Sequence, residues 1–190
     1  MSCSVLVVAR GMDGRAPMLA HSFDTAGGTD FRLVKVPAMK HEANSMRPVF
    51  CYDENSLPRF AGTLRGAIPE YTALQEAASV PIGFIPQVPE TFAYWEAASG
   101  ICNEQGVMLA ECTCSSIFAA EPKPKGKALL GYMELTRLAL ERASTAREAV
   151  TLMGELAEQH GFYGNSLRLT GAAESLAVAG TISEGLIHLA

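Results

Sequence analysis

The hydrophobic residues of the chain recur with two different periods, one typical of strands and one typical of helices. A continuous apolar run, SVLVV at residues 4–8, predicts a buried strand near the amino terminus. Residues 16–24 predict a second strand, and the loop before it contains Gly and Asp, so we expect a hairpin. Residues 31–38 alternate between polar and apolar side chains, which indicates a half-exposed strand.

The middle of the chain predicts an irregular segment and then further strands. Residues 40–75 contain several prolines and glycines, and so long a loop in a compact domain is usually functional or poorly ordered. Residues 80–88 and 91–101 are rich in strand-forming and aromatic side chains. Residues 100–114 predict a strand, a turn at residues 103–106 (NEQG) and a returning strand.

Helical periodicity begins after a linker rich in Pro and Lys. Residues 131–143 and 145–161 predict two helices, and in the second the apolar residues recur at i, i+3, i+4, i+7 and i+8. Thr145 followed by Glu148 matches a capping box, and Gly161 is a typical helix end. The short break between the helices predicts an antiparallel pair.

Residues 174–190 return to strand character, so the order is strands, a helical pair and strands. Strands grouped apart from helices predict the α+β class. We expect one domain over residues 1–190. Because the chain stops inside a strand-like run, we expect that domain to be incomplete at its carboxyl-terminal end.

Composition and charge narrow the function classes. Hydrophobic residues make up 48% of the 190 residues, the net charge is −5, and no cluster of Lys and Arg is present. We therefore expect a globular protein with no nucleic-acid partner. No apolar run approaches the ~20 residues that cross a bilayer, so we expect no membrane partner and a cytoplasmic location. Whether the chain forms a homo-oligomer stays open.

The spacing of the cysteines and histidines does not match a metal site, and we expect no metal and no cofactor. Five cysteines in a chain without an export signal indicate free thiols in a reducing compartment. Cys112 and Cys114 have the wrong spacing for a zinc half-site, and the histidines show no ligand spacing. Nucleotide-binding, metalloprotease and serine-hydrolase motifs are absent from the sequence.

Three residues are candidates for nucleophilic catalysis. If Met1 and Ser2 were removed, Cys3 would carry a thiol nucleophile and its own α-amino group as general base. Asp24, at the end of the second predicted strand, could bind and orient that ammonium. Asn103, in the predicted turn, could donate a hydrogen bond to an oxyanion.

Each candidate also has a structural interpretation. Cysteine is among the most buried residue types, so Cys3 could belong to the core. Asp24 precedes small residues and glycines, as turn formers do. Asn103 is a residue type favoured in turns because it tolerates positive φ.

Two long segments carry a resemblance to a known family. Residues 91–115 (TFAYWEAASGICNEQGVMLAECTCS) and 134–164 (ELTRLALERASTAREAVTLMGELAEQHGFYG) resemble the C69 peptidase family, which includes dipeptidase A and the secernins. Residues 56–71 (SLPRFAGTLRGAIPEY) resemble the secernin branch, and residues 173–179 (AESLAVA) resemble the strand after the helical pair. That family is similar to the N-terminal nucleophile hydrolases, which implies a four-layer αββα sandwich.

The resemblance implies roles for particular residues. Cys3 matches the N-terminal nucleophile, Asp24 the carboxylate near its amino group, and Asn103 the oxyanion-hole asparagine. His21 stands where the wider superfamily often has Arg, so a permanent charge is replaced by an imidazole that still forms hydrogen bonds. Glu111 belongs to the family-like ECTC strand and is expected to support the site or line its pocket.

The implied activity is hydrolysis of a small peptide, with a dipeptide as the expected substrate and no cofactor. The alternative is a secernin-like protein that acts through protein–protein contacts. Family members are usually longer, and the missing carboxyl-terminal region together with His21 favours this alternative. Gly180 is a further departure, since the family pattern prefers Asp there. A third interpretation is a fragment that does not fold alone.

Overall fold

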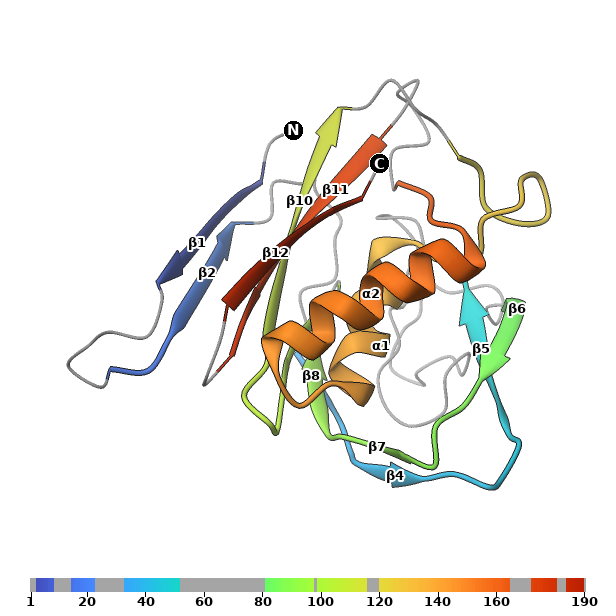
Figure 1. Ribbon diagram of the computed structural model, residues 1–190, viewed down its shortest axis with the longest axis horizontal. Coiled ribbons are helices and arrows are strands. Elements are labelled where there is room, and N and C mark those ends of the chain that lie inside the picture. The colour runs from blue at the N-terminus through green and yellow to red at the C-terminus, as the bar shows by residue number, and fades with distance from the viewer. Residues whose placement is uncertain are drawn as a thin grey trace, which may run out of the picture.

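The computed structural model describes residues 3–8, 15–22, 33–51, 81–97, 99–115, 120–164, 172–180 and 184–189. Their strands and helices form a mixed α+β fold, which confirms the predicted class (Figure 1). The elements are β1 (Ser4–Val8), β2 (Met18–Ser22), β3 (Val34–Val36), β4 (Met39–Lys40), β5 (Met46–Phe50), β6 (Pro81–Pro86), β7 (Glu90–Thr91), β8 (Tyr94–Glu96), β9 (Gly100–Asn103), β10 (Met108–Ser115), α1 (Tyr132–Arg142), α2 (Ala146–His160), β11 (Ala172–Ala179) and β12 (Glu184–Leu189).

The described strands form one six-stranded sheet and three two-stranded sheets. The large sheet has the order β12-β11-β10-β9-β8-β3, and the small ones pair β1 with β2, β4 with β7 and β5 with β6. Each of these pairings is antiparallel. The four-layer sandwich remains a prediction.

The predicted amino-terminal hairpin is confirmed. Strands β1 and β2 pair from Ser4 opposite Ser22 to Val8 opposite Met18, and the Ser4 amide donates to Ser22 Oγ at 3.1 Å. Both strands contact β10, so the hairpin lies alongside the large sheet (Figure 1). The start of the chain is therefore placed next to a strand more than a hundred residues away.

The turn between β9 and β10 also forms as predicted. The Gly106 amide donates to the Asn103 carbonyl at 3.1 Å, which closes the turn. Gly106 has φ of 81°, a conformation that suits a residue without a Cβ atom. The short turn joins two neighbouring strands of the large sheet.

The two predicted helices are confirmed. Thr145 caps α2, since its hydroxyl accepts from the Glu148 amide at 3.2 Å. Glu148 accepts in return from the Ser144 amide and hydroxyl, at 2.9 and 2.6 Å. These bonds lower the pKa of Glu148. Gly161, with φ of 76°, ends the helix.

The prediction of an irregular segment over residues 40–75 was wrong at its start. Strand β5 occupies residues 46–50 and contains Pro48, which lies opposite Phe84 of β6. Proline is tolerated at a sheet edge because its missing N–H can face away from the pairing partner. Residues 52–80 lie outside the described part of the chain.

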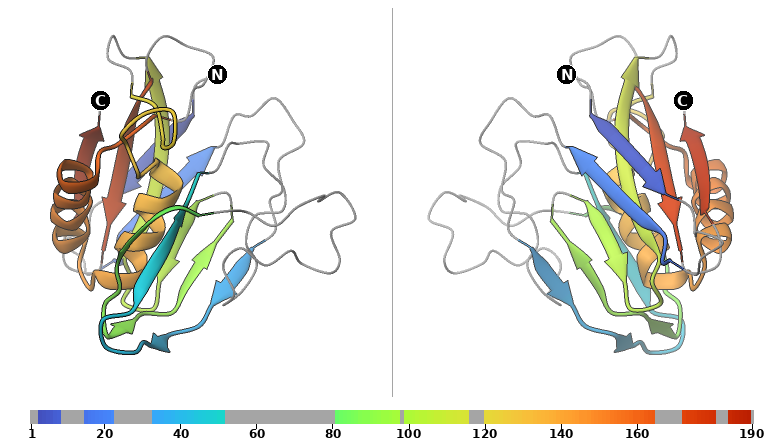
Figure 2. Two further views of the ribbon diagram at one scale, coloured as in Figure 1. Left: turned by 90° about the vertical axis from the view of Figure 1, so that its right-hand side faces the viewer. Right: turned by 90° about the vertical axis from the view of Figure 1, so that its left-hand side faces the viewer.

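Helix α1 lies inside the molecule, between β10 and β5 (Figure 2). Its apolar residues share a core with those of α2 and of the strands. Polar residues of α1 are buried as well: Glu134, Thr136, Arg137 and Glu141 are each no more than 5% exposed. In the described ranges, neither helix is long and apolar enough to span a membrane.

Buried ion pairs join the charged residues of α1 to strands. Arg47 of β5 donates from Nε to Glu141 Oε2 at 2.8 Å and from Nη2 to Glu141 Oε1 at 3.1 Å, and it also binds Glu134. On β8, Glu96 accepts from Arg137 Nε at 2.6 Å. A buried charge is costly unless it is paired, so these contacts fix where α1 can lie.

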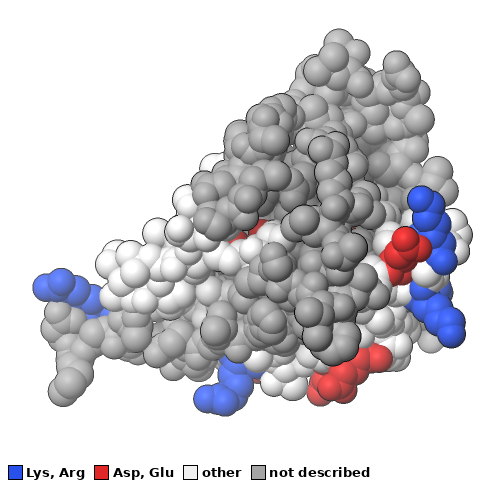
Figure 3. Space-filling model, turned by 90° about the horizontal axis from the view of Figure 1, so that it is seen from above, with Lys and Arg blue, Asp and Glu red and all other residues white. Residues whose placement is uncertain are grey.

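We predict that Arg47→Met lowers the free energy of unfolding by about 3–5 kcal/mol, because two buried carboxylates lose their partner. Urea unfolding followed by circular dichroism measures the change. The control is Lys40→Met, which removes an exposed pair with Glu90 at 3.3 Å and should change stability by less than about 1 kcal/mol. Most of the Lys, Arg, Asp and Glu side chains visible in Figure 3 lie near the edge of that face. Equal effects of the two substitutions would contradict the prediction.

We predict that Thr145→Ala lowers the free energy of unfolding by about 1 kcal/mol, because the first turn of α2 loses its cap. Thr151, exposed in the middle of the same helix, is the matched control. Thr151→Ala should leave stability unchanged or raise it by a few tenths of a kcal/mol, roughly, since Ala favours helix. Thermal melts of both variants measure the change in stability. A Thr145→Ala chain that is as stable as the wild type would refute the prediction.

Candidate active site

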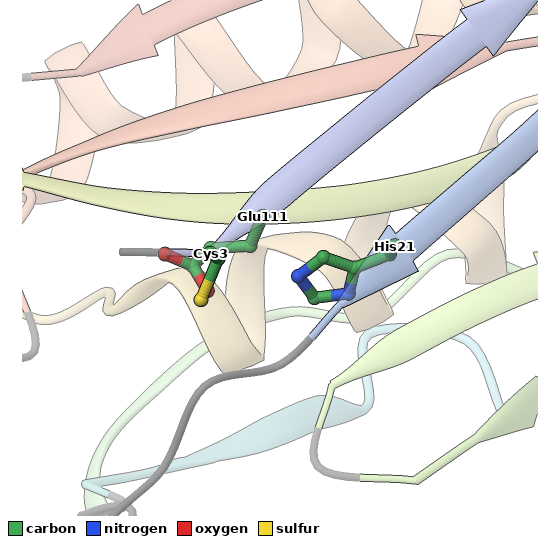
Figure 4. Close-up of side chains that lie close together, drawn as sticks. All are labelled: Cys3, His21 and Glu111. Atoms are coloured by element: carbon green, nitrogen blue, oxygen red, sulfur yellow. The ribbon is translucent and has the colours of Figure 1, made fainter. Parts of the chain in front are cut away.

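Three of the residues singled out in the sequence meet in space. The Cys3 sulfur, a ring nitrogen of His21 and a carboxylate oxygen of Glu111 all lie within 4.8 Å of one another. Figure 4 shows the three side chains converging, and we call them the Cys3 cluster. Cys3 is half-buried, His21 is exposed, and Glu111 is 1% exposed.

The strand pairing explains how the Cys3 cluster forms. Cys3 directly precedes β1, and His21 lies on β2 opposite Val5, so the hairpin brings these two residues to the same end. Glu111 lies within β10, which both hairpin strands contact. Two members therefore come from the hairpin and one comes from the large sheet.

Glu111 carries an unsatisfied buried oxygen. Its Oε1 accepts from the Thr113 hydroxyl at 2.7 Å, whereas its Oε2 is buried and has no hydrogen-bond partner in the described part of the chain. The ion pairs found among the described residues do not include Glu111. Buried carboxylate oxygens are normally paired, so this atom marks the cluster as a site that can accept a partner.

The chemistry of the Cys3 cluster suits two tasks. A thiol, an imidazole and a carboxylate provide a nucleophile, a base and a group that can orient the base. The base matters because the thiolate, and not the thiol, is the reactive form. The same side chains also offer sulfur, nitrogen and oxygen as metal ligands.

Asn103 lies in a different environment from the one expected of an oxyanion donor. Its side-chain amide donates to the carbonyls of Leu140 and Ala143, at 3.0 and 2.8 Å, at the end of α1. Its Oδ1 accepts from the amides of Gln105 and Val107 at 3.1 and 3.0 Å. Both N–H groups are thus used in this conformation, and the catalytic role of Asn103 stays a prediction.

The remaining predicted residues divide into those described and those outside. Asp24 lies outside the described residues, so its role stays a prediction. None of the cysteines with described side chains, Cys3, Cys51, Cys102 and Cys112, is in a disulfide. Burial raises the pKa of Cys102, which makes that thiol a weaker nucleophile at neutral pH.

The sequence indicated each member of the Cys3 cluster but not their meeting. Glu111 is 90 residues from His21, and no local pattern connects a strand residue to a hairpin that packs beside it. Cys3 was singled out by its place near the amino terminus, whereas the resemblance pointed to His21 and Glu111.

Comparison with known families identifies the class of the protein. The chain matches the family described as peptidase family C69 over residues 68–174, more than half of its length. It belongs to peptidase family C69, as the sequence resemblance had indicated. The matched region contains Asn103 and Glu111, while Cys3 and His21 precede it.

We predict that Asn103→Ala lowers the free energy of unfolding by about 2 kcal/mol, because the end of α1 and the turn both lose buried hydrogen bonds. The control is Gln105→Ala, since Gln105 is exposed in the same turn. Urea unfolding of both variants measures the difference. If Asn103→Ala is as stable as the wild type, the structural role given to this amide is wrong.

Proposed function

We propose that the chain is a cysteine-type amide hydrolase that cleaves dipeptides, with Cys3 as its nucleophile. Membership of a peptidase family supports a peptide as the substrate. The observation that carries the proposal is the Cys3 cluster, where the Cys3 sulfur lies within 4.8 Å of an imidazole nitrogen and a carboxylate oxygen. None of the other cysteines with described side chains belongs to such a group among the described residues.

The proposed reaction proceeds through a thioester. The Cys3 sulfur gives its proton to a base and attacks the peptide carbonyl carbon. The carbon–nitrogen bond then breaks, and the base returns the proton to the departing amine. Water attacks the thioester carbon and gives a proton to the same base. The carbon–sulfur bond then breaks, the base returns the proton to the Cys3 sulfur, and the carboxylic acid leaves.

Two groups can serve as the base. Removal of Met1 and Ser2 would give Cys3 a free α-amino group, whose ordinary pKa of about 7.7–8.0 suits a general base. His21 offers a second base inside the Cys3 cluster, and this one does not depend on processing. We propose the amine as the base, with Asp24 orienting it and with His21 and Glu111 in supporting positions.

The proposal includes the remaining family features. The four-layer αββα sandwich is the architecture we propose for the complete fold, and the mixed α+β arrangement supports it. The cytoplasm is the proposed location, because no cysteine with a described side chain is in a disulfide, and cysteines outside disulfides are typical of reducing compartments.

We predict that the purified chain hydrolyses dipeptides and that Cys3→Ala lowers kcat/KM by at least about a thousandfold, as expected for loss of a nucleophile. Cys51→Ala is the matched control, since Cys51 is exposed and lies outside the Cys3 cluster. Release of amino acids from a dipeptide panel measures the rate. Equal activity of the Cys3→Ala and wild-type chains would overturn the proposal.

Intact-mass analysis of the active preparation identifies the base. A mature chain that begins at Cys3 is the expected result. A chain from which Ser2 is deleted, so that removal of Met1 alone exposes Cys3, should be fully active. Full activity in a preparation that keeps Met1 and Ser2 would exclude the amine and assign the base to His21.

One observation favours a second function, a protein that works through contacts with other proteins. Leu6, Val8 and Met18 of the hairpin are 63%, 40% and 60% exposed, and Val8 lies opposite Met18. Exposed apolar side chains that lie together mark candidate interaction surfaces. Absence of hydrolysis across the dipeptide panel, together with a cooperative thermal melt, would support this alternative.

A further inference from the structure

The Cys3 cluster presents three kinds of metal-binding atom around one point. The sulfur, the ring nitrogen and the carboxylate oxygen lie within 4.8 Å of one another (Figure 4). Zinc is bound in proteins by these atom types, and many zinc sites combine three protein ligands with one open position for water. We infer that Cys3, His21 and Glu111 form a zinc-binding site, with its fourth position open to solvent.

The spacing of the donors suits a tetrahedral ion. Bond lengths of about 2.0–2.3 Å place neighbouring ligand atoms roughly 3.5 Å apart. The observed separations are at most 4.8 Å, so shifts of the donor atoms by about 1 Å would bring them to these distances. His21 is exposed, which gives the ion a path from solvent.

The buried oxygen of Glu111 supports the site independently of this spacing. Glu111 is 1% exposed, and its Oε2 has no hydrogen-bond partner in the described ranges. Thr113 donates to the other oxygen at 2.7 Å, which is how ligating carboxylates are commonly held in place. A bound cation would supply the charge partner that this buried carboxylate needs.

Charge and protons balance when zinc binds. The Cys3 thiol gives up its proton to solvent, so the thiolate and the Glu111 carboxylate together offset the two positive charges of Zn²⁺. His21 binds as a neutral imidazole. All three donors are side-chain atoms, so the site needs neither the removal of Met1 and Ser2 nor the proposed peptidase activity. In an active peptidase, bound zinc would occupy the nucleophilic sulfur and block hydrolysis reversibly.

Cobalt titration tests the site without any assay of activity. The metal-free full-length chain is titrated with Co²⁺, which takes zinc's place and reports a bound thiolate through charge-transfer absorption in the near ultraviolet. We predict saturation at one ion per chain and loss of the absorption when Zn²⁺ is added. Cys3→Ser should abolish the absorption, and Glu111→Gln, which keeps the side-chain shape, should weaken binding at least about tenfold. Cys51→Ser should bind as the wild type does.

Several outcomes overturn the site. They are a folded wild-type chain without charge-transfer absorption, the same absorption in Cys3→Ser, and unchanged affinity in Glu111→Gln. Circular dichroism melts establish that each variant is folded, and if Cys3→Ser does not fold, Glu111→Gln decides. A chain that binds cobalt but hydrolyses no dipeptide keeps the zinc site and loses the proposed function. A chain that hydrolyses dipeptides but binds no cobalt keeps the proposed function and loses the zinc site.

Discussion

The fold depends on an arginine that is buried away from water. Arg47 is 2% exposed and holds two carboxylates of α1, Glu134 and Glu141, which lie two helical turns apart. Because neither carboxylate is tolerated in the core without its partner, α1 can occupy the interior only in the position and rotation that satisfy Arg47. Tyr94 contributes to the same group, since its hydroxyl donates to Glu141 Oε1 at 3.4 Å.

Asn103 connects the end of α1 to the part of the large sheet that carries the candidate site. This side chain joins the end of α1 to the turn between β9 and β10, because its amide binds two helix carbonyls while its oxygen binds two turn amides. Strand β10 starts at this turn and carries Glu111. Asn103, which was expected to contact the substrate, thus supports the structure next to the site. A structural role affects the free energy of unfolding, whereas an oxyanion role affects the catalytic rate.

Much of the fold could be predicted because its signals are local. The turn at residues 103–106 and the cap at Thr145 depend on residues a few positions apart, and the hairpin pairs two strands that follow each other in the sequence. The strand through Pro48 was missed, since proline argues against a strand until an edge position is known. The pairing of Arg47 with α1 spans 87 and 94 residues, and no local pattern reports it. The same reason explains the site, whose members were recognised singly while their meeting required the packing of the hairpin on β10.

The Cys3 cluster is built from two separate parts of the fold. This affects the order in which the site and the fold are lost on heating. Cys3 and His21 belong to the hairpin segment, whereas Glu111 belongs to the large sheet, which shares a hydrophobic core with both helices. Detachment of the hairpin would separate the sulfur from the carboxylate while most of the buried contacts persist. Loss of the site and loss of the fold are therefore distinct events, and the first can occur at a temperature at which the second has not begun.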